Sequence, residues 1–413
     1  MSRRVVVTGV GVVSPLGIGR GPSWEAATAG RSGAGPITRF DTDGYDATIA
    51  CEVKGFAPGD FLEHRVARRA DRVTQLAVAA AKLAAEDGGF SVPGDGRRVG
   101  CIMATGTGGN GVREENDDVL HERGPDRLSP FTIPHSMLNM PSAMIAMQLG
   151  IKGPVFATVT ACAAGADAIG VASEIIRRGD ADAVMAGGAD AMITPFWVAA
   201  FDAMRVLAHD HGDPAAAARP FNADREGFLI GEGAAVLLLE TAEAAEARGA
   251  RVICELAGYG ASSDAHHITD PDPTGESQAR AMLLALGQAG LEPGRVGYVN
   301  AHGGGSRPGD PSEVRAIRTA IGDAAGRTLV SGTKSMHGHC MGATGALEAA
   351  LTVMAIEAGT VPPTINLIDL DPECAGVDHV ANEARTADLD AAMTINNGLG
   401  GHNAALVFTK ADG

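Results

Sequence analysis

The chain has 413 residues, of which 45% are hydrophobic, so it can bury one large composite core or two domains. Its formal net charge of −17 disfavours nucleic acid and anionic membranes as general partners, because an acidic surface repels both. No uninterrupted apolar run approaches the roughly 20 residues that span a membrane, and the first residues lack the apolar core of a signal peptide. We therefore expect a cytoplasmic protein that binds neither membrane nor nucleic acid.

The cysteines are scattered along the chain without Cys-x-x-Cys pairs, at positions 51, 101, 162, 254, 340 and 374. This spacing predicts neither a disulfide framework nor a structural zinc site, and we expect no bound metal.

Strand-like and helix-like segments alternate along the chain. Short apolar runs predict strands, at 3–15, 99–105, 183–189, 231–240, 296–301 and 400–408. Ala-rich runs predict helices, at 74–85, 163–178, 276–290 and 342–358. The alternation is typical of a layered α/β fold with buried sheets. Because 231–240 and 400–408 both run from glycines into an apolar strand, we expect two similar halves, 1–252 and 253–413.

Four arginines near the start of the chain recur at helical spacing. If 64–84 is one helix, its one face carries Arg65, Arg68, Arg69 and Arg72. Two interpretations stay open: a basic patch for an acidic partner, or a solvated helix face.

Cys162 stands between a β-branched run and an Ala/Gly-rich one. If a helix begins at residue 163, the thiol lies at its N-terminus, where free N–H groups and the helix dipole favour the thiolate. A nucleophile is one interpretation, and a small buried apolar side chain is the other.

Glycine-rich segments follow three predicted strands, and two of them carry candidate site residues: 298–310 contains His302, and 331–345 contains Lys334, His337 and His339. The third is 396–403. Glycine lets the backbone approach a ligand closely and leaves N–H groups free to bind an oxyanion. Each histidine alone also suits a structural role, whereas one cysteine with two such histidines predicts an active site.

Six motifs follow one another along nearly the whole chain: Val-Val-Val-Thr-Gly-Val-Gly (5–11), Thr-Ala-Cys-Ala-Ala-Gly (160–165), Arg-Pro-Phe-Asn-Ala-Asp-Arg-Glu-Gly (219–227), Asn-Ala-His-Gly (300–303), Thr-Lys-Ser-Met-His-Gly-His (333–339) and Gly-Leu-Gly-Gly-His-Asn (398–403). In these motifs the chain resembles the β-ketoacyl-ACP synthases of the thiolase superfamily, especially β-ketoacyl-ACP synthase II and the ketosynthase subunits of type II polyketide synthases. The resemblance implies a thiolase-like, five-layered αβαβα fold from two similar halves.

The resemblance also implies the chemistry. Cys162 would accept an acyl group from the phosphopantetheine arm of an acyl carrier protein. His302 and His339, as neutral rings donating N–H, would then promote the decarboxylation of malonyl-ACP and its attack on the acyl thioester. Because the substrates arrive on a carrier, no separate cofactor is implied.

Supporting residues follow from the same resemblance. Lys334 would hold the electrostatic arrangement with Glu348 as its ionic partner, and the main-chain N–H groups of the nucleophile and of Leu399 would form the oxyanion hole. Asp310 and Glu313 would support the site, or else form a solvated loop pair.

The substrate channel departs from the usual family pattern. The resemblance assigns the acyl pocket and gate to Thr107, Thr132, Phe228, Asn397 and Leu399, and the pantetheine tunnel to Thr269, Gly304 and Ser306. Gly304 stands where the family has a threonine, and Asn397 and Leu399 replace two phenylalanines. Smaller, partly polar linings suit a longer or unsaturated acyl chain, which favours a polyketide-type, polyene-extending enzyme. His337 stands where the fatty-acid enzyme usually has a hydroxyl residue. It either adjusts the substrate preference or only packs in the core.

The resemblance implies an acidic carrier protein, docked by basic residues beside the tunnel: Arg65, Arg68, Arg69, Arg72, Arg127 and Arg205. It also implies a dimer, either a homodimer or a heterodimer with a chain-length-factor subunit. The alternatives are a housekeeping fatty-acid β-ketoacyl-ACP synthase II, a non-catalytic chain-length factor, which lacks the active cysteine, and a thiolase, which uses a second cysteine as its base.

Overall fold

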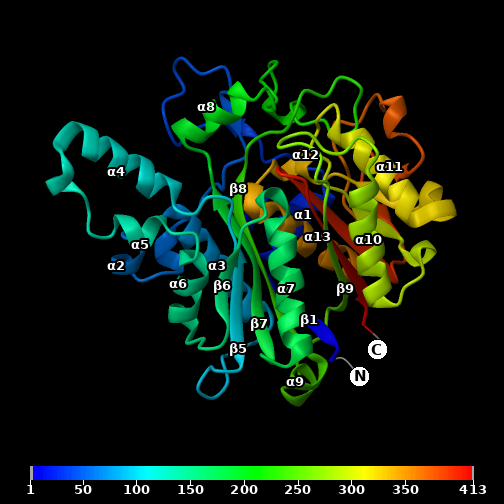
Figure 1. Ribbon diagram of the computed structural model, residues 1–413, viewed down its shortest axis with the longest axis horizontal. Coiled ribbons are helices and arrows are strands. Elements are labelled where there is room, and N and C mark those ends of the chain that lie inside the picture. The colour runs from blue at the N-terminus through cyan, green and yellow to red at the C-terminus, as the bar shows by residue number, and fades with distance from the viewer. Residues whose placement is uncertain (1–2, 412–413) are drawn as a thin grey trace.

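The computed structural model describes residues 3–411 (Figure 1). The strands are β1 (Val5–Ser14), β2 (Gly17–Ile18), β3 (Gly35–Pro36), β4 (Ile49–Ala50), β5 (Val99–Ala104), β6 (Val155–Thr158), β7 (Ala183–Ala191), β8 (Glu232–Thr241), β9 (Cys254–Ser263), β10 (Tyr298–Asn300), β11 (Leu329–Ser331), β12 (Thr360–Val361), β13 (Asp378–His379), β14 (Arg385–Thr386), β15 (Ala391–Gly398) and β16 (His402–Lys410). The helices are α1 (Arg20–Thr28), α2 (His64–Ala67), α3 (Arg72–Asp87), α4 (Asn110–Arg123), α5 (Thr132–Ser136), α6 (Met140–Leu149), α7 (Ala164–Arg178), α8 (Pro195–Ala203), α9 (Ala242–Ala247), α10 (Glu276–Ala289), α11 (Gly309–Ile321), α12 (Lys334–His337) and α13 (Thr344–Ala358).

The main sheet has 12 strands and consists of two halves, here called the first and the second sheet, with the same strand order and directions; β2 adds to β1 and β13 to β11, and β3-β4 and β12-β14 form separate pairs. The first half has the order β1-β8-β7-β5-β6, and the second half has β9-β16-β15-β10-β11. In each, the first two pairings are antiparallel and the last two are parallel. The sheets join where β1 pairs with β9, at Val6 and Val7. The predicted similarity of the two halves is therefore confirmed, whereas the boundary at residue 253 stays a prediction.

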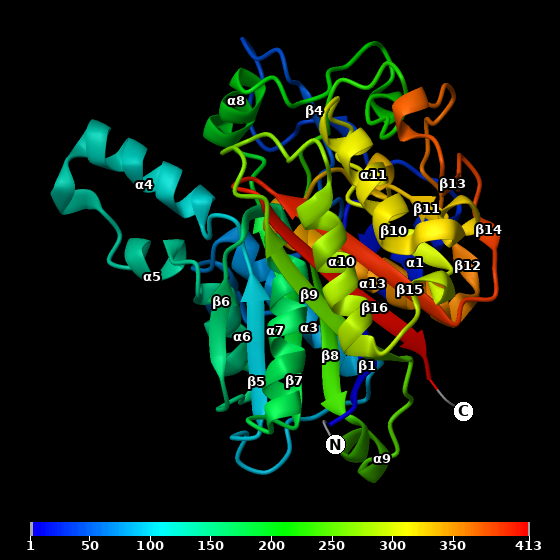
Figure 2. The same cartoon turned by 45° about the vertical axis from the view of Figure 1, so that its right-hand side comes forward.

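Helices and sheets alternate in five layers (Figure 2). Alternate residues of β5 face opposite sides: Cys101 and Met103 pack in the core beneath α3, whereas Ile102 packs in the core shared by α7 and α13. The core on the far side of the second sheet is formed with α10 and α11. The buried pair α7 and α13 thus lies between the two sheets, which confirms the predicted αβαβα fold.

Two glycines allow α7 and α13 to approach closely. A Cβ atom on Gly165 would lie 2.5 Å from the backbone nitrogen of Ala346, and one on Gly345 would lie 2.5 Å from that of Ala166. Both helices begin near this crossing, so their N-terminal ends are held next to one another. This contact brings a turn from each half to the centre of the molecule.

The predicted strands and helices are present with shifts of a few residues at their ends. The condition for one arginine face, a single helix over 64–84, is not met. The chain leaves helical geometry between α2 and α3, where Asp71 adopts an extended conformation and accepts a hydrogen bond from the N–H of Val73. Asp71 is the N-cap of α3, so a new helix begins after it.

Helices α4 and α5 project from the body as an arm, at the left of Figures 1 and 2. The apolar side chains Phe131, Ile133 and Met137 of this region are exposed. Within residues 3–411, one helical segment, Met341–Ala358, is long and apolar enough to cross a membrane, and 89% of it is buried inside the molecule. It is therefore explained as a core helix.

Candidate active site

Cys162 lies in a tight turn between β6 and α7. The turn is a 3-10 helix over Ala161–Ala163, and it requires Ala161 to adopt a positive φ of 51°. Cys162 is partly exposed, whereas the other five cysteines are buried. The thiol receives hydrogen bonds from the main-chain N–H groups of Leu399 and of Cys162 itself. The two N–H groups assigned to the oxyanion hole are therefore together at this sulfur.

The N–H group of Cys162 at the start of the helix lowers the pKa of the thiol, in the expected direction, but burial has the larger, opposite effect. Burial raises the pKa of Cys162 to about 11, and the Lys334 ammonium together with the two N–H groups offsets only part of that effect. Cys162 is therefore a thiol at neutral pH, and it must lose its proton during attack.

His302 follows β10 and faces the same cavity as Cys162. Its Nδ1 lies 3.2 Å from Lys334 Nζ and 3.4 Å from the backbone nitrogen of Asn397, and both of these groups are donors. Nδ1 is thus an acceptor, which places the ring proton on Nε2. Burial, the Lys334 charge and His339 hold the pKa of His302 well below its usual range, so the ring is neutral.

His339 has the same tautomer for a similar reason. Its Nδ1 accepts from the N–H of Met341 at 3.0 Å and is 3.0 Å from the hydroxyl of Thr344. Burial first, and then Lys334, hold the pKa of His339 well below its usual range. The rings of His302 and His339 meet edge to face with centroids 5.4 Å apart, and Phe228 packs against His339 at 4.8 Å. Two neutral imidazoles, each with a proton on Nε2, therefore line one cavity with the thiol.

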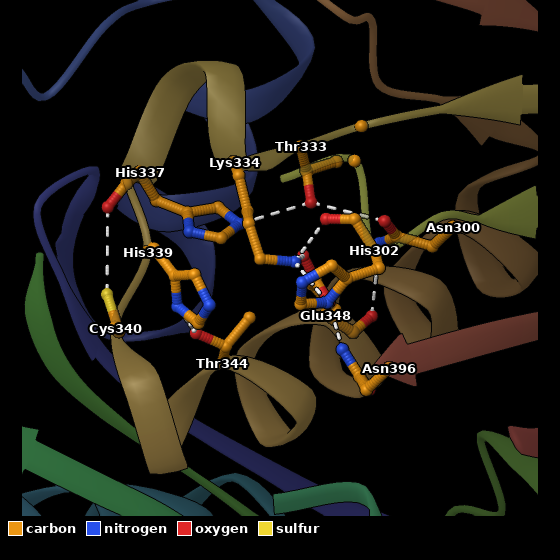
Figure 3. A network of polar contacts seen from close by, with 12 residues as sticks. Asn300, His302, Thr333, Lys334, His337, His339, Cys340, Thr344, Glu348 and Asn396 are labelled. Atoms are coloured by element: carbon orange, nitrogen blue, oxygen red, sulfur yellow. Dashed lines mark hydrogen bonds and ion pairs between the residues drawn. The ribbon is translucent and has the colours of Figure 1, made fainter. Parts of the chain in front are cut away.

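Lys334 is the centre of a buried polar network (Figure 3). Its Nζ is 2.7 Å from Glu348 Oε1 and donates to the carbonyl of His302. The second oxygen of Glu348 accepts from Asn396 Nδ2 at 2.5 Å. Burial raises the pKa of Glu348 to about 7, opposed by Lys334 and Asn396. The predicted Lys334–Glu348 ion pair is thus present, and it fixes the position of His302.

Two carboxylates on α11 hold the glycine-rich loop after β10. Glu313 accepts from the N–H of His302 and, at 2.8 Å, from that of Gly303. Asp310 accepts from the N–H of Gly305 at 2.9 Å and lies 3.4 Å from the guanidinium of Arg225. Both carboxylates are 1% exposed, so the alternative of a solvated loop pair is wrong.

His337 is buried beside this network. Its Nε2 contacts the hydroxyl of Thr333 at 3.1 Å, and its Nδ1 has no hydrogen-bond partner within residues 3–411. Burial and the Lys334 charge lower the pKa of His337 to about 3, so the ring is neutral. His337 does not line the cavity.

Most of the predicted channel residues line the cavity that contains Cys162. They are Phe228, Thr269, Gly304, Ser306, Asn397 and Leu399. Thr107 and Thr132 do not line it. The hydroxyl of Thr107 accepts from Asn110 at the start of α4, and Thr132 lies on α5 with its hydroxyl 2.7 Å from Asn116.

Several residues of the site were not predicted from the sequence. Met341, two residues after His339, lines the cavity, and Asp190 accepts from the N–H of Gly342 at 2.7 Å. A signal for Asp190 was present, because it is a single carboxylate within an apolar strand, and such a group needs buried donors. Asn396 carried no comparable signal.

The predicted basic face is only partly formed. Arg65, Arg68, Arg69, Arg127 and Arg205 are exposed, and within residues 3–411 none of them has an ion pair. Arg72 is different, because its guanidinium donates two hydrogen bonds of 2.6 Å to the buried carboxylate of Glu232. Including Arg72 in a docking face was therefore wrong, because Arg72 begins α3 and points inward.

Comparisons with known proteins agree with this site. The family model "Beta-ketoacyl synthase, N-terminal domain" matches residues 2–245, and "Beta-ketoacyl synthase, C-terminal domain" matches residues 253–368. The chain is 44% identical over 410 residues to 3-oxoacyl-[acyl-carrier-protein] synthase 2 of Staphylococcus aureus (strain COL), covering 99% of both chains.

Solved structures give the same result. The ishigamide ketosynthase/chain length factor is 38% identical, with a TM-score of 0.93 and full coverage of both chains. A type II polyketide synthase ketosynthase in complex with its acyl-carrier protein, named AntDE:AntF, is 31% identical, with a TM-score of 0.91 and full coverage of both chains. The chain belongs to the β-ketoacyl synthase family. It is a ketosynthase of the β-ketoacyl-ACP synthase II type, an acyltransferase that forms a carbon–carbon bond.

Proposed function

We propose that Cys162, His302, His339 and Lys334 carry out a decarboxylative condensation between an acyl group and malonyl-ACP. The observation that supports it best is the shared cavity, in which two neutral histidines with protonated Nε2 atoms stand beside the thiol. Such rings can donate hydrogen bonds to developing negative charge without carrying charge themselves.

In the first step, the sulfur of Cys162 attacks the acyl thioester on the carrier's phosphopantetheine arm. A carbon–sulfur bond to the enzyme forms, the bond to the pantetheine sulfur breaks, and the cysteine proton passes to the departing thiol. The N–H groups of Cys162 and Leu399 stabilise the tetrahedral oxyanion, because both already point at this position.

In the second step, malonyl-ACP loses CO₂. The electron pair of the broken carbon–carbon bond forms an enolate, whose oxygen accepts hydrogen bonds from Nε2 of His302 and His339. The enolate carbon attacks the acyl thioester, and the sulfur of Cys162 leaves and takes up a proton. Burial, aided by the charge of Lys334, keeps both histidines neutral, and Lys334 also orients His302.

For the pathway, we propose that the chain is the catalytic subunit of a type II polyketide synthase that extends unsaturated chains. The likeness to the ishigamide ketosynthase and the aliphatic Leu399 at the gate support it. A fatty-acid β-ketoacyl-ACP synthase II is the second candidate, favoured by the 44% identity to the Staphylococcus aureus enzyme.

Mass spectrometry of Cys162 after incubation with matched saturated and polyunsaturated acyl carriers distinguishes the two pathways. Preferential loading of polyunsaturated chains is the expected result, and loading of saturated chains alone would exclude the polyketide proposal. Cys162→Ala, treated identically, is the control and should carry no acyl group.

The acidic acyl carrier protein would dock on exposed arginines that have no ion pair within residues 3–411: Arg65, Arg68, Arg69, Arg127 and Arg205. We expect Arg68→Glu to raise the KM for the carrier about tenfold, most strongly at low salt, because steering by surface charge is screened by ions. Charge reversal at Arg31, which is exposed but already paired with Glu25, is the matched control. An unchanged KM in Arg68→Glu would remove that residue from the docking face.

A second subunit would pair along β6. Within residues 3–411 this strand has a partner only in β5, and the apolar side chains Met147, Phe156 and Val159 are exposed beside it. An unpaired apolar edge favours strand pairing with another chain. Because Thr132 lies on the projecting arm and away from the cavity of its own chain, we propose that it lines the acyl pocket of the partner subunit. The partner is a second copy or a chain-length factor, and the proposed location is the cytoplasm.

A further inference from the structure

One carboxylate behind the nucleophile is not used in the proposed mechanism. Asp167 lies in the first turn of α7 and is 8% exposed. One of its oxygens accepts from the hydroxyl of Thr160, and the other accepts from the hydroxyl of Tyr259 at 2.8 Å. A carboxylate is thus held between a residue of the nucleophile turn and a residue of the second half.

Thr160 is placed to control the turn. It stands two residues before Cys162 and directly before Ala161, whose positive φ of 51° is unfavourable for a residue with a side chain. A conformation of this kind persists only when surrounding contacts hold it. The bond from Thr160 to Asp167 is such a contact, because it ties the start of the turn to the helix that follows it.

Tyr259 connects the turn to the second half of the molecule. It lies on β9, which runs beside α7 in Figure 2. Its ring packs against Gly170, where an added Cβ atom would lie 2.2 Å from the ring. Its N–H donates to Gln288 Oε1 of α10 at 2.8 Å. The ring is therefore held against α7 and the backbone of Tyr259 is held against α10, which places the hydroxyl at Asp167.

We propose that Thr160, Asp167 and Tyr259 form a positioning chain that holds Cys162 and its N–H group in register with the second half. The N–H of Leu399, the second donor of the oxyanion hole, belongs to that half, so acyl transfer depends on a contact that crosses between the halves. No proton or electron moves through the chain; the two hydroxyls donate and the carboxylate accepts. This role deepens the proposed function and rests on it.

The test removes one hydroxyl at a time. We expect Thr160→Val and Tyr259→Phe each to slow acylation of Cys162 about tenfold, with the KM for the acyl carrier changed less than twofold, because misplacement of reacting atoms lowers rate more than binding. Thr160→Ser retains the hydroxyl and should stay within about twofold of the natural enzyme. Tyr298→Phe, which removes the hydroxyl of another buried tyrosine, one bonded to Ser331, is the matched control and should also stay within about twofold.

Two further measurements separate positioning from general loss of structure. In a Cys162→Ala background, Thr160→Val should leave CO₂ release from malonyl-ACP unchanged, because the histidines alone act there. The double variant Thr160→Val/Tyr259→Phe should be no slower in acylation than the slower single variant, since both act through Asp167. The proposal would be overturned if the losses of acylation rate in the double variant were additive, or if Thr160→Ser acylated as slowly as Thr160→Val. It would also be overturned if Thr160→Val lost CO₂ release in the Cys162→Ala background.

Alkylation of Cys162 by iodoacetamide needs no acyl carrier, and it distinguishes the two proposals. We expect the alkylation rate to fall in Thr160→Val and Tyr259→Phe and to be retained in Thr160→Ser. If the variants rank in this order while the natural enzyme accepts no acyl group, the proposed function fails and the positioning chain stands. Equal alkylation in all four proteins would overturn the positioning chain itself.

Discussion

The turn that carries Cys162 has a counterpart in the second half, at Met341–Ala343. Both are 3-10 turns that lead into a buried helix, and both begin with a residue at positive φ, 51° at Ala161 and 46° at Met341. Gly342 thus occupies the position that corresponds to Cys162. The repeated topology supplies the same strained turn twice.

The difference lies in what each turn presents. The N–H and thiol of Cys162 face the cavity, whereas the N–H of Gly342 donates to the buried carboxylate of Asp190 at 2.7 Å. A Cβ atom on Gly342 would lie 2.5 Å from the backbone nitrogen of Gly106. One turn is therefore open for chemistry, and the other is closed by an internal anion and close packing. The second half supplies the polar network around Lys334 instead.

The largest expected effect comes from removing the open turn's nucleophile. Cys162→Ala should lower condensation about a thousandfold or more, because no other cysteine in residues 3–411 lines the cavity. Its Tm should stay close to that of the natural protein, since alanine fits the same backbone. Product formation and thermal unfolding, measured on the same sample, check both parts. If a partner ketosynthase is present in the assay, condensation at the natural rate would instead favour a non-catalytic chain-length factor.

The next effect concerns the second half's network. Lys334→Met leaves Glu348 buried without its ionic partner, which should cost about 3–5 kcal/mol of the free energy of unfolding. It should also slow CO₂ release from malonyl-ACP about a hundredfold, because His302 loses the group that orients it.

The double variant Lys334→Met/Glu348→Gln separates stability from chemistry. It should recover most of the free energy of unfolding, because no unpaired buried charge remains, and still release CO₂ slowly. Urea unfolding and CO₂ assays on the single and double variants test this. Recovery of CO₂ release along with stability would show that Lys334 has only a structural role.

A third variant tests the closed turn directly. Gly342→Ala places a methyl group against Gly106 and Asp190, so we expect a loss of about 1–3 kcal/mol in the free energy of unfolding. Cys162→Ala puts the same residue at the corresponding position of the open turn and serves as the matched control. Equal unfolding free energies for the two variants would contradict the proposed difference between the turns.

The fold was largely predictable from the sequence because local patterns carry it. Apolar strands and Ala-rich helices set the layers, and the similar runs at 231–240 and 400–408 indicated the repeat, since these are β8 and β16, equivalent strands of the two sheets. The break before Arg72 was readable too, because Asp71 is an ordinary N-cap residue. Helical spacing alone gave the wrong result there.

The site was predictable in its residues but not in its electrostatics. Motifs identified Cys162, His302, His339 and Lys334, and the structure places them together. The pKa of Cys162 depends on burial by parts of the chain distant in sequence, and local spacing carries no information about that. The same holds for Asp190, whose donors come from Gly106 and Gly342. Contacts between segments that are far apart in the sequence determine both properties.

The smallest expected effect is a dependence of stability on pH that arises in the closed turn. Burial raises the pKa of Asp190 to about 6, against the N–H donors of Gly106 and Gly342 and the hydroxyl of Thr105. In the unfolded chain the group has its ordinary pKa near 4. Between these values the folded protein binds more protons than the unfolded chain, so its stability falls as pH rises from about 4 to about 6.

Asp190→Asn removes this titration and isolates it from that of the other acids. Relative to the variant, the natural protein should gain about 1 kcal/mol in the free energy of unfolding when pH is lowered from 7 to 5.5. Urea unfolding of both proteins at the two pH values measures the difference. If the free energy of unfolding changed equally with pH in both proteins, burial would not raise the pKa of the Asp190 carboxylate.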